Sequence, residues 1–104
     1  MGIYRGRLDI IADILHVVGG NARKTKIMYQ ANLSYRVLQR YLAQILEASL
    51  ASFECEKRCY VLTAKGRVFL EAYREYSEIN RRVEKGLASV RSKSKVLEEL
   101  VSSK

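Results

Sequence analysis

The C-terminal part of the chain carries an apolar repeat that a long helix would present along one side. At alternating spacings of four and three residues, the repeat runs through Phe69, Tyr73, Tyr76, Asn80, Val83, Leu87, Val90, Ser94, Leu97 and Val101. More than four heptads of this kind predict a coiled coil rather than a helix that covers a small core. A continuous helix from Ala64 to Leu100 would be about 55 Å long, and Thr63 is placed to cap it.

The repeat also predicts a homodimer, because its apolar seam would be exposed in a lone subunit. The seam residues from Tyr73 to Val101 are therefore the expected dimer interface. Antiparallel pairing with Leu87 layered against Val90 would set Glu84 against Arg91 twice. Parallel pairing would instead let Asn80 meet Asn80, which can fix the register. The flanking charges slightly favour the antiparallel arrangement, and the asparagine favours the parallel one.

The charge of the chain favours a polyanionic partner. Nineteen Lys and Arg residues oppose eleven Asp and Glu residues, for a formal charge of +8 over 104 residues. Such a balance indicates nucleic acid first and an anionic membrane surface second. No acidic residue occurs between Ile14 and Leu46, a stretch that contains Arg23, Lys24, Lys26, Arg36 and Arg40. The positive field is therefore expected around residues 23 to 40.

Two helices are predicted before residue 31. The first runs from Leu8 to Val18, with Gly19 and Gly20 expected to end it by adopting positive φ. The second is short and runs from Thr25, a possible cap, to Gln30.

A third helix, within Asn32–Leu46, has two chemically different sides. Its apolar stripe consists of Leu38, Leu42, Ile45 and Leu46, and its opposite side carries Arg36, Gln39, Arg40 and Ala43. Ser34 is a plausible N-cap, and Asn32 can close the preceding helix in a left-handed conformation. Two helices joined by so short a turn, the second amphipathic and basic, predict a helix-turn-helix.

A β-hairpin is predicted after the third helix. Ala51 to Cys55 and Cys59 to Leu62 read as short strands around a turn that contains Glu56, Lys57 and Arg58. Three helices followed by a hairpin indicate the winged version of the motif. Lys57 and Arg58 at the tip would either lie beside a nucleic-acid backbone or form a solvated turn.

The chain offers little for catalysis or metal binding. Cys55 and Cys59 could be free thiols or a disulfide, and together with His16 they fall short of a zinc site. His16 is expected to be a surface or half-buried side chain. Without an acid pair, a histidine dyad or a phosphate-binding glycine loop, we expect no enzyme, cofactor or small-molecule substrate. The apolar runs are too short to span a membrane, and the expected location is cytoplasmic and nucleoid-associated.

Three stretches, in this order, resemble one family. They are RGRLDIIADIL, KTKIMYQANLSY from Lys24 to Tyr35, and YVLTAKGRVFLE from Tyr60 to Glu71. They are similar to the small, ten-kilodalton archaeal winged-helix DNA-binding proteins first known from Sulfolobus chromatin. This resemblance implies a dimer joined by a long antiparallel coiled coil, with a DNA-binding head at each end. It places Tyr35, Arg36, Gln39 and Arg40 on the recognition helix and Lys57 and Arg58 on the wing. It implies no role for the two cysteines.

The sequence therefore predicts a mainly α (α+β) protein with a winged helix-turn-helix head over residues 1–62 and a coiled-coil helix over residues 63–104. The expected function is that of a double-stranded DNA-binding homodimer, with Arg23, Lys24 and Lys26 on phosphates. An architectural chromatin protein and a sequence-specific regulator both fit this pattern. A coiled-coil interaction module without DNA binding is the alternative from another class.

Overall fold

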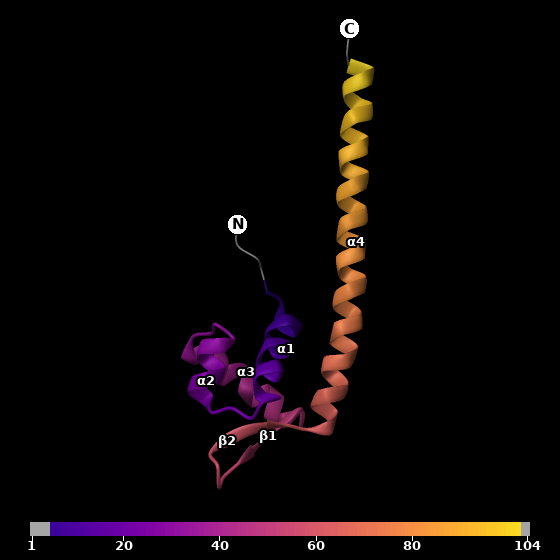
Figure 1. The fold of residues 1–104 in the computed structure, drawn as a ribbon. Helices are drawn as coiled ribbons and strands as arrows, with labels where there is room; N and C mark the ends of the chain where they lie inside the picture. The colour runs from indigo at the N-terminus through magenta and orange to yellow at the C-terminus, as the bar shows by residue number, and fades with distance from the viewer. Residues whose placement is uncertain (1–4, 103–104) are drawn as a thin grey trace. The chain divides into compact units, whose positions relative to one another are not determined.

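A computed structural model describes residues 5–102 of the chain, and its elements follow the predicted order (Figure 1). They are α1 (Arg7–Val18), α2 (Lys24–Gln30), α3 (Tyr35–Glu47), β1 (Ala51–Glu54), β2 (Cys59–Leu62) and α4 (Ala64–Ser102). The helices, the hairpin and the long C-terminal helix confirm the predicted mainly α (α+β) class, whereas the dimeric coiled coil stays a prediction. The chain forms two compact units, residues 1–73 and 74–104. We call residues 5–73 the head and residues 74–102 the distal α4 segment, and describe each by itself.

The core of the head lies where α1, α2 and α3 meet. Its largest fully buried side chains are Ile14, Leu15, Val18, Ile27, Leu38 and Ile45. Each apolar side chain of this size gains about 1.5–3 kcal/mol when it leaves water. Phe69 and Leu70 of α4 pack against the same core. The first turns of α4 therefore help to cover the core of the head.

The helix ends correct two expectations. Gly19 has φ −57°, and none of the described glycines has positive φ; Asn21, at φ 57°, is the left-handed residue after α1. Thr25 does not cap α2, which begins one residue earlier and has Arg23 at its N-cap without a side-chain hydrogen bond. An asparagine can adopt the left-handed conformation because its short polar side chain lowers the cost, so the glycines were not required for that role.

The other capping predictions are confirmed. Asn32 follows α2 with φ 55°, and Leu33 N–H donates to the Met28 carbonyl at 3.0 Å, as in a Schellman motif. Ser34 accepts a hydrogen bond from Val37 N–H at 3.3 Å, capping α3.

Strands β1 and β2 form the expected antiparallel hairpin. The register pairs Ala51 with Leu62 and Glu54 with Cys59. Cys55 was expected to end the first strand, but it lies in the turn, because the ladder stops at Glu54. Ala22, between α1 and α2, adds two backbone hydrogen bonds to Tyr60, at 3.1 and 2.7 Å. The hairpin is thus hydrogen-bonded to the connection between α1 and α2, a contact that the sequence did not predict.

The start of α4 is bonded to the end of α3. As predicted, Thr63 caps α4, and its hydroxyl oxygen accepts from Gly66 N–H at 3.0 Å. The same hydroxyl donates to the Ser49 carbonyl at 2.6 Å, and Lys65 Nζ donates to the Ala48 carbonyl at 2.8 Å. The Lys65 bond satisfies the carbonyl of the α3 C-cap residue, which has no helical partner, and the Thr63 bond satisfies the carbonyl of the next residue.

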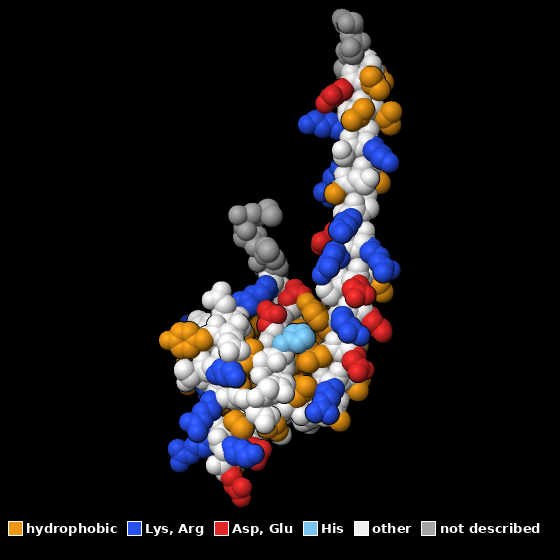
Figure 2. Space-filling model, viewed as in Figure 1, with side chains coloured by type: hydrophobic (Ala, Val, Ile, Leu, Met, Phe, Trp, Pro, Cys, Tyr) orange, Lys and Arg blue, Asp and Glu red, His pale blue; other side chains and the backbone are white. Residues whose placement is uncertain are grey.

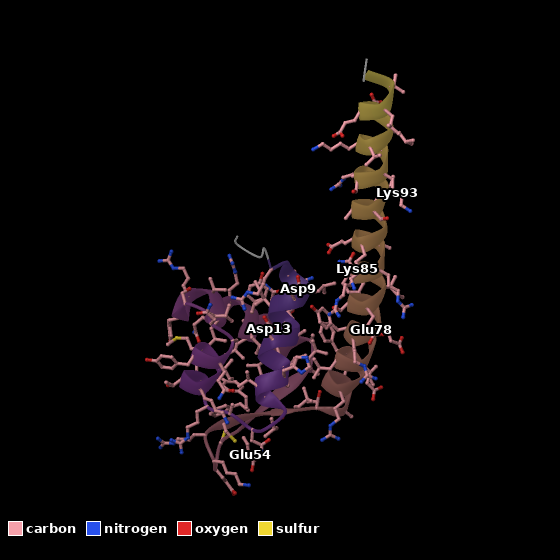
Figure 3. The ribbon with its side chains drawn as sticks, turned by 45° about the horizontal axis from the view of Figure 1, so that its top comes forward. Asp9, Asp13, Glu54, Glu78, Lys85 and Lys93 are labelled. Atoms are coloured by element: carbon pink, nitrogen blue, oxygen red, sulfur yellow. The ribbon has the colours of Figure 1, made fainter. Side chains whose placement is uncertain are left out.

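A second set of bonds joins α4 to α1 within the head. The Tyr73 hydroxyl donates to Asp9 Oδ1, and the other carboxylate oxygen accepts from Gly6 N–H at 2.9 Å. The Tyr73 hydroxyl, the Gly6 amide and the charge of Arg5 hold the pKa of Asp9 below its ordinary value, against a smaller raising effect of burial. Figure 3 labels Asp9 on α1. Tyr73, expected in the dimer interface, therefore uses its hydroxyl inside the head.

Gly66 supplies a test of the packing between α4 and the hairpin. A Cβ atom there would overlap the Leu50 carbonyl oxygen and would lie 2.5 Å from the Leu62 side chain. Because one of these neighbours is backbone, Gly66→Ala should lower the free energy of unfolding by about 2–3 kcal/mol. Urea denaturation followed by circular dichroism at one fixed protein concentration measures this.

Gly86→Ala is the matched control, since no atom lies within 4 Å of a Cβ at that position. It should stabilise the helix by about 1 kcal/mol. Equal unfolding midpoints for the Gly66 variant and the unaltered protein would contradict the close packing at Gly66.

Candidate nucleic-acid interface

Helix α3 presents a polar surface because its other side is held in the core. Leu38, Leu42 and Ile45 are buried, as predicted. Leu46 was expected in the same stripe but is 37% exposed, since it lies about 100° around the helix from Ile45. The predicted outward residues are all exposed: Arg36, Gln39, Arg40 and Ala43. Tyr35, at the start of the helix, is 58% exposed.

The structure brings three of the predicted site residues together. Lys24, at the start of α2, donates from Nζ to Gln39 Oε1 at 2.5 Å. The same ammonium lies 5.5 Å from the centroid of the Tyr35 ring, a cation–π distance. Lys24 therefore joins α2 to α3 and fixes the amide of Gln39. No sequence pattern indicated this cluster, because residues 24 and 39 lie on different helices.

The other cations around α3 are free to meet a ligand. Within residues 5–102, Arg23, Lys26 and Arg36 make no hydrogen bond or ion pair, and all three are exposed. Arg40 lies over the ring of Tyr41 at 5.6 Å from its centroid. Figure 2 shows Lys and Arg side chains on the side of the head where α2 and the hairpin turn lie. This surface of exposed cations is suited to an anionic partner.

The hairpin turn is exposed and carries charges of both signs. Lys57 and Arg58 are both exposed in the turn, with Arg58 left-handed at φ 50°. Glu54 and Glu56 lie in the same short stretch, so two cations are offset by two carboxylates. Within the described residues, neither Lys57 nor Arg58 bonds to α2 or α3. The predicted wing pair is therefore separate from the Lys24 cluster.

Both cysteines are free thiols in the structure. Cys55 is exposed in the turn, whereas Cys59 is buried and pairs across the hairpin with Glu54. His16 is exposed on α1, as expected. Within residues 5–102, no three metal-ligating side chains gather. Over the same residues, no helix has the length and apolarity to cross a membrane.

Several cations that sequence reasoning left unassigned have internal roles. Arg5 forms an ion pair with Asp13 at 2.9 Å and donates to the carbonyls of Ala31 and Asn32 at 2.7 and 2.9 Å. These bonds complete the end of α2. Arg7 donates to Gln44 Oε1 on α3 at 3.1 and 3.0 Å. Such pairings connect residues far apart in the chain, and nothing in the local sequence signals them.

The predicted interface residues of the distal α4 segment are exposed in the single chain. Leu87 and Val90, at its centre, are 50% and 65% exposed. Exposed side chains also include Tyr76, Asn80, Val83, Ser94, Leu97 and Val101. A run of apolar side chains along one helix is unusual for a surface that faces only water.

Comparison with known proteins agrees with this architecture. The family described as winged helix-turn-helix matches residues 4–81. The uncharacterized protein MJ0290 of Methanocaldococcus jannaschii is 34% identical over 74 residues, 70% of this chain and 34% of the relative. MJ0287 of the same organism, also uncharacterized, is 32% identical over 76 residues, 72% of this chain and 76% of that relative. The chain thus spans about a third of the first relative's length and about three quarters of the second's.

A solved structure shares the fold over most of the chain. It is the crystal structure of Sso10a-2, described as a DNA-binding protein from Sulfolobus solfataricus, with 26% identity and a TM-score of 0.79. The match covers 85% of this chain and 95% of that one. With three helices, a hairpin and a family match over most of its length, this chain belongs to the winged helix-turn-helix family.

Proposed function

We propose that this protein is a double-stranded DNA-binding homodimer in which the outward side of α3 enters the major groove. The observation that carries the proposal is the exposure of Arg36, Gln39 and Arg40 opposite a fully buried stripe. Membership of the winged helix-turn-helix family supports it, as does the similarity to a structure described as a DNA-binding protein.

The side chains of α3 suit two kinds of contact. Arginine can bond bidentately to guanine, and glutamine can reach base edges. Because Gln39 Oε1 already accepts from Lys24, its amide NH₂ group is the part left to donate to base acceptors. Arg23 and Lys26 lie near the start of α2 and would neutralise phosphates, which fix the orientation of the head without reading sequence.

The wing would contribute less than α3. Lys57 and Arg58 can reach phosphates, but Glu54 and Glu56 reduce the local field of the turn. We therefore assign these two cations to phosphate contacts at the edge of the interface.

The homodimer is proposed from the exposed seam of the distal α4 segment. A second copy would cover Val83, Leu87 and Val90, which are each at least half exposed in the single chain. We favour antiparallel pairing, in which Glu84 faces Arg91 on both sides of the centre, and the resemblance to the Sulfolobus-type proteins supports this orientation. Asn80 would then face a different core position of the partner.

Two such heads on one dimer suit an architectural protein of the nucleoid, and the strongly basic charge supports this role. A sequence-specific regulator is the second candidate, favoured by the base-reading side chains on α3. Footprinting separates the two, since an architectural protein protects DNA broadly and a regulator protects a few sharp sites. An interaction module without DNA binding would leave duplex mobility unchanged at physiological salt.

Replacing Arg36 and Arg40 together with alanine should weaken duplex binding by about thirtyfold or more, since each arginine contact contributes about 1–3 kcal/mol. Dimerisation should not change, because both side chains are exposed on the head. Fluorescence anisotropy at low salt measures the affinity, and sedimentation velocity measures the assembly.

The matched control is Arg67→Ala with Arg74→Ala, which removes two exposed cations from α4 outside the proposed interface. This control should bind nearly as well as the unaltered protein. Equal weakening in the two variants would show that only net charge matters, and would contradict the role of α3.

Leu87→Glu should convert the dimer to a monomer, because it would bury a carboxylate at the centre of the seam. Sedimentation equilibrium gives the mass. Ala88→Glu adds the same charge one residue away, off the seam, and should leave the dimer intact. A Leu87→Glu protein that remains dimeric would exclude this interface.

A further inference from the structure

One stretch of the distal α4 segment carries a dense positive charge that dimerisation does not require. Between Arg81 and Lys95 there are six cations and a single acid, Glu84, which leave a formal charge of +5. The cations are Arg81, Arg82, Lys85, Arg91, Lys93 and Lys95, and all are exposed. Within residues 5–102 none of them forms an ion pair. We call residues 81–95 the basic segment.

Most of these cations lie away from the apolar seam. With Leu87 and Val90 at the a and d positions, Arg81, Arg82, Lys85 and Lys95 fall at the b, c and f positions. Arg81, Arg82 and Lys85 line one shallow hollow together with Glu78. Figure 3 labels Lys85, Lys93 and Glu78 on α4. Pairing through the seam would therefore leave this outward side accessible.

The residues between the cations are small. Ala88, Ser89 and Ser92 occupy the outward positions between Lys85 and Lys95. Short side chains let another surface approach the helix closely, and serine hydroxyls are frequent donors to phosphate oxygens. Small polar residues flanked by cations are therefore suited to a phosphate backbone.

We infer that the basic segment is a second duplex-DNA-binding surface, which contacts the phosphate backbone without reading sequence. The inference rests on the proposed function and adds a contact surface to it. The outward cations span about 21 Å, a length over which a duplex carries about twelve negative charges. Charge complementarity thus selects the duplex backbone as the occupant.

One pair of cations in the basic segment is unfavourably spaced for the helix alone. Arg81 and Lys85 are one turn apart on the same side, and like charges at this spacing destabilise a helix. Glu78 lies near enough to line the same hollow, yet forms no ion pair with either within the described residues. An anionic partner would remove this repulsion and release condensed counterions from the DNA.

The test compares the salt dependence of binding to a duplex of arbitrary sequence. Arg82→Gln with Lys85→Gln removes two outward cations while keeping residues that favour helix. Removing one cation that neutralises a phosphate should make the slope of log Kobs against log salt concentration shallower by about 0.9. The double variant should therefore have a slope shallower by about 2 per chain. Lys93→Gln with Lys95→Gln provides a second variant of the same segment.

Arg67→Gln with Arg74→Gln is the control, because it removes the same charge from outward positions of α4 outside the basic segment. It should keep the slope of the unaltered protein. Sedimentation velocity and circular dichroism on all variants establish equal assembly and helicity.

The outcomes separate this inference from the proposed function. A weakened Arg36→Ala/Arg40→Ala variant together with unchanged slopes for both basic-segment variants would overturn only the second surface. An equal change of slope in the Arg67→Gln/Arg74→Gln control would also overturn the second surface, because the effect would then follow from net charge alone. If the basic-segment variants had a shallower slope with an RNA duplex but not with the DNA duplex, the second surface would also be overturned. If the unaltered protein did not bind duplex DNA, both proposals would be overturned.

Discussion

The burial of one side of α3 is the constraint on which the rest of the head depends. Leu38, Leu42 and Ile45 enter a core shared with α1 and α2, and this fixes the rotation of the helix about its axis. Each residue advances by about 100° around a helix, so a different rotation would exchange polar for apolar residues at the surface. The outward position of Arg36, Gln39 and Arg40 is thus a consequence of packing. A surface that reads DNA needs such a fixed orientation.

Polar contacts at the helix ends complete this arrangement. The left-handed Asn32 turns the chain between α2 and α3, while Lys24 bonds across that turn to Gln39. Thr63 and Lys65 bind the carbonyls at the other end of α3. Both ends of the helix are therefore held by residues outside it, which limits how far its exposed side chains can move.

Local patterns in the sequence predicted the elements well and the contacts between them poorly. The stripe of α3, the caps Ser34 and Thr63, and the long helix from Ala64 follow from periodicity and from side chains that bond to neighbouring amides. The Ala22–Tyr60 bridge and the Lys24–Gln39 bond could not be predicted, because they join residues brought together only by folding. The prediction that Gly19 and Gly20 are left-handed was wrong. Asn21 takes that conformation instead, which an asparagine can also adopt. The prediction that Lys57 and Arg58 form part of a wing depended more on the family resemblance than on their charge.

The distal α4 segment combines two patterns on one helix. Its apolar seam is proposed to pair with a second copy, and the cations of residues 81–95 lie mainly on the outward positions. The two uses do not compete, because heptad positions separate them around the helix. Under both proposals, one helix carries the contact between two copies and a row of positive charge.

The most direct test of the central claim is a nuclear magnetic resonance titration of the isotope-labelled protein with a short DNA duplex. If α3 is the groove-reading element, the largest shifts should fall on the amides of Tyr35 to Arg40 and on the side-chain NH₂ group of Gln39. The account would be contradicted if saturating DNA shifted the resonances of α1 or the hairpin and left those of α3 unchanged.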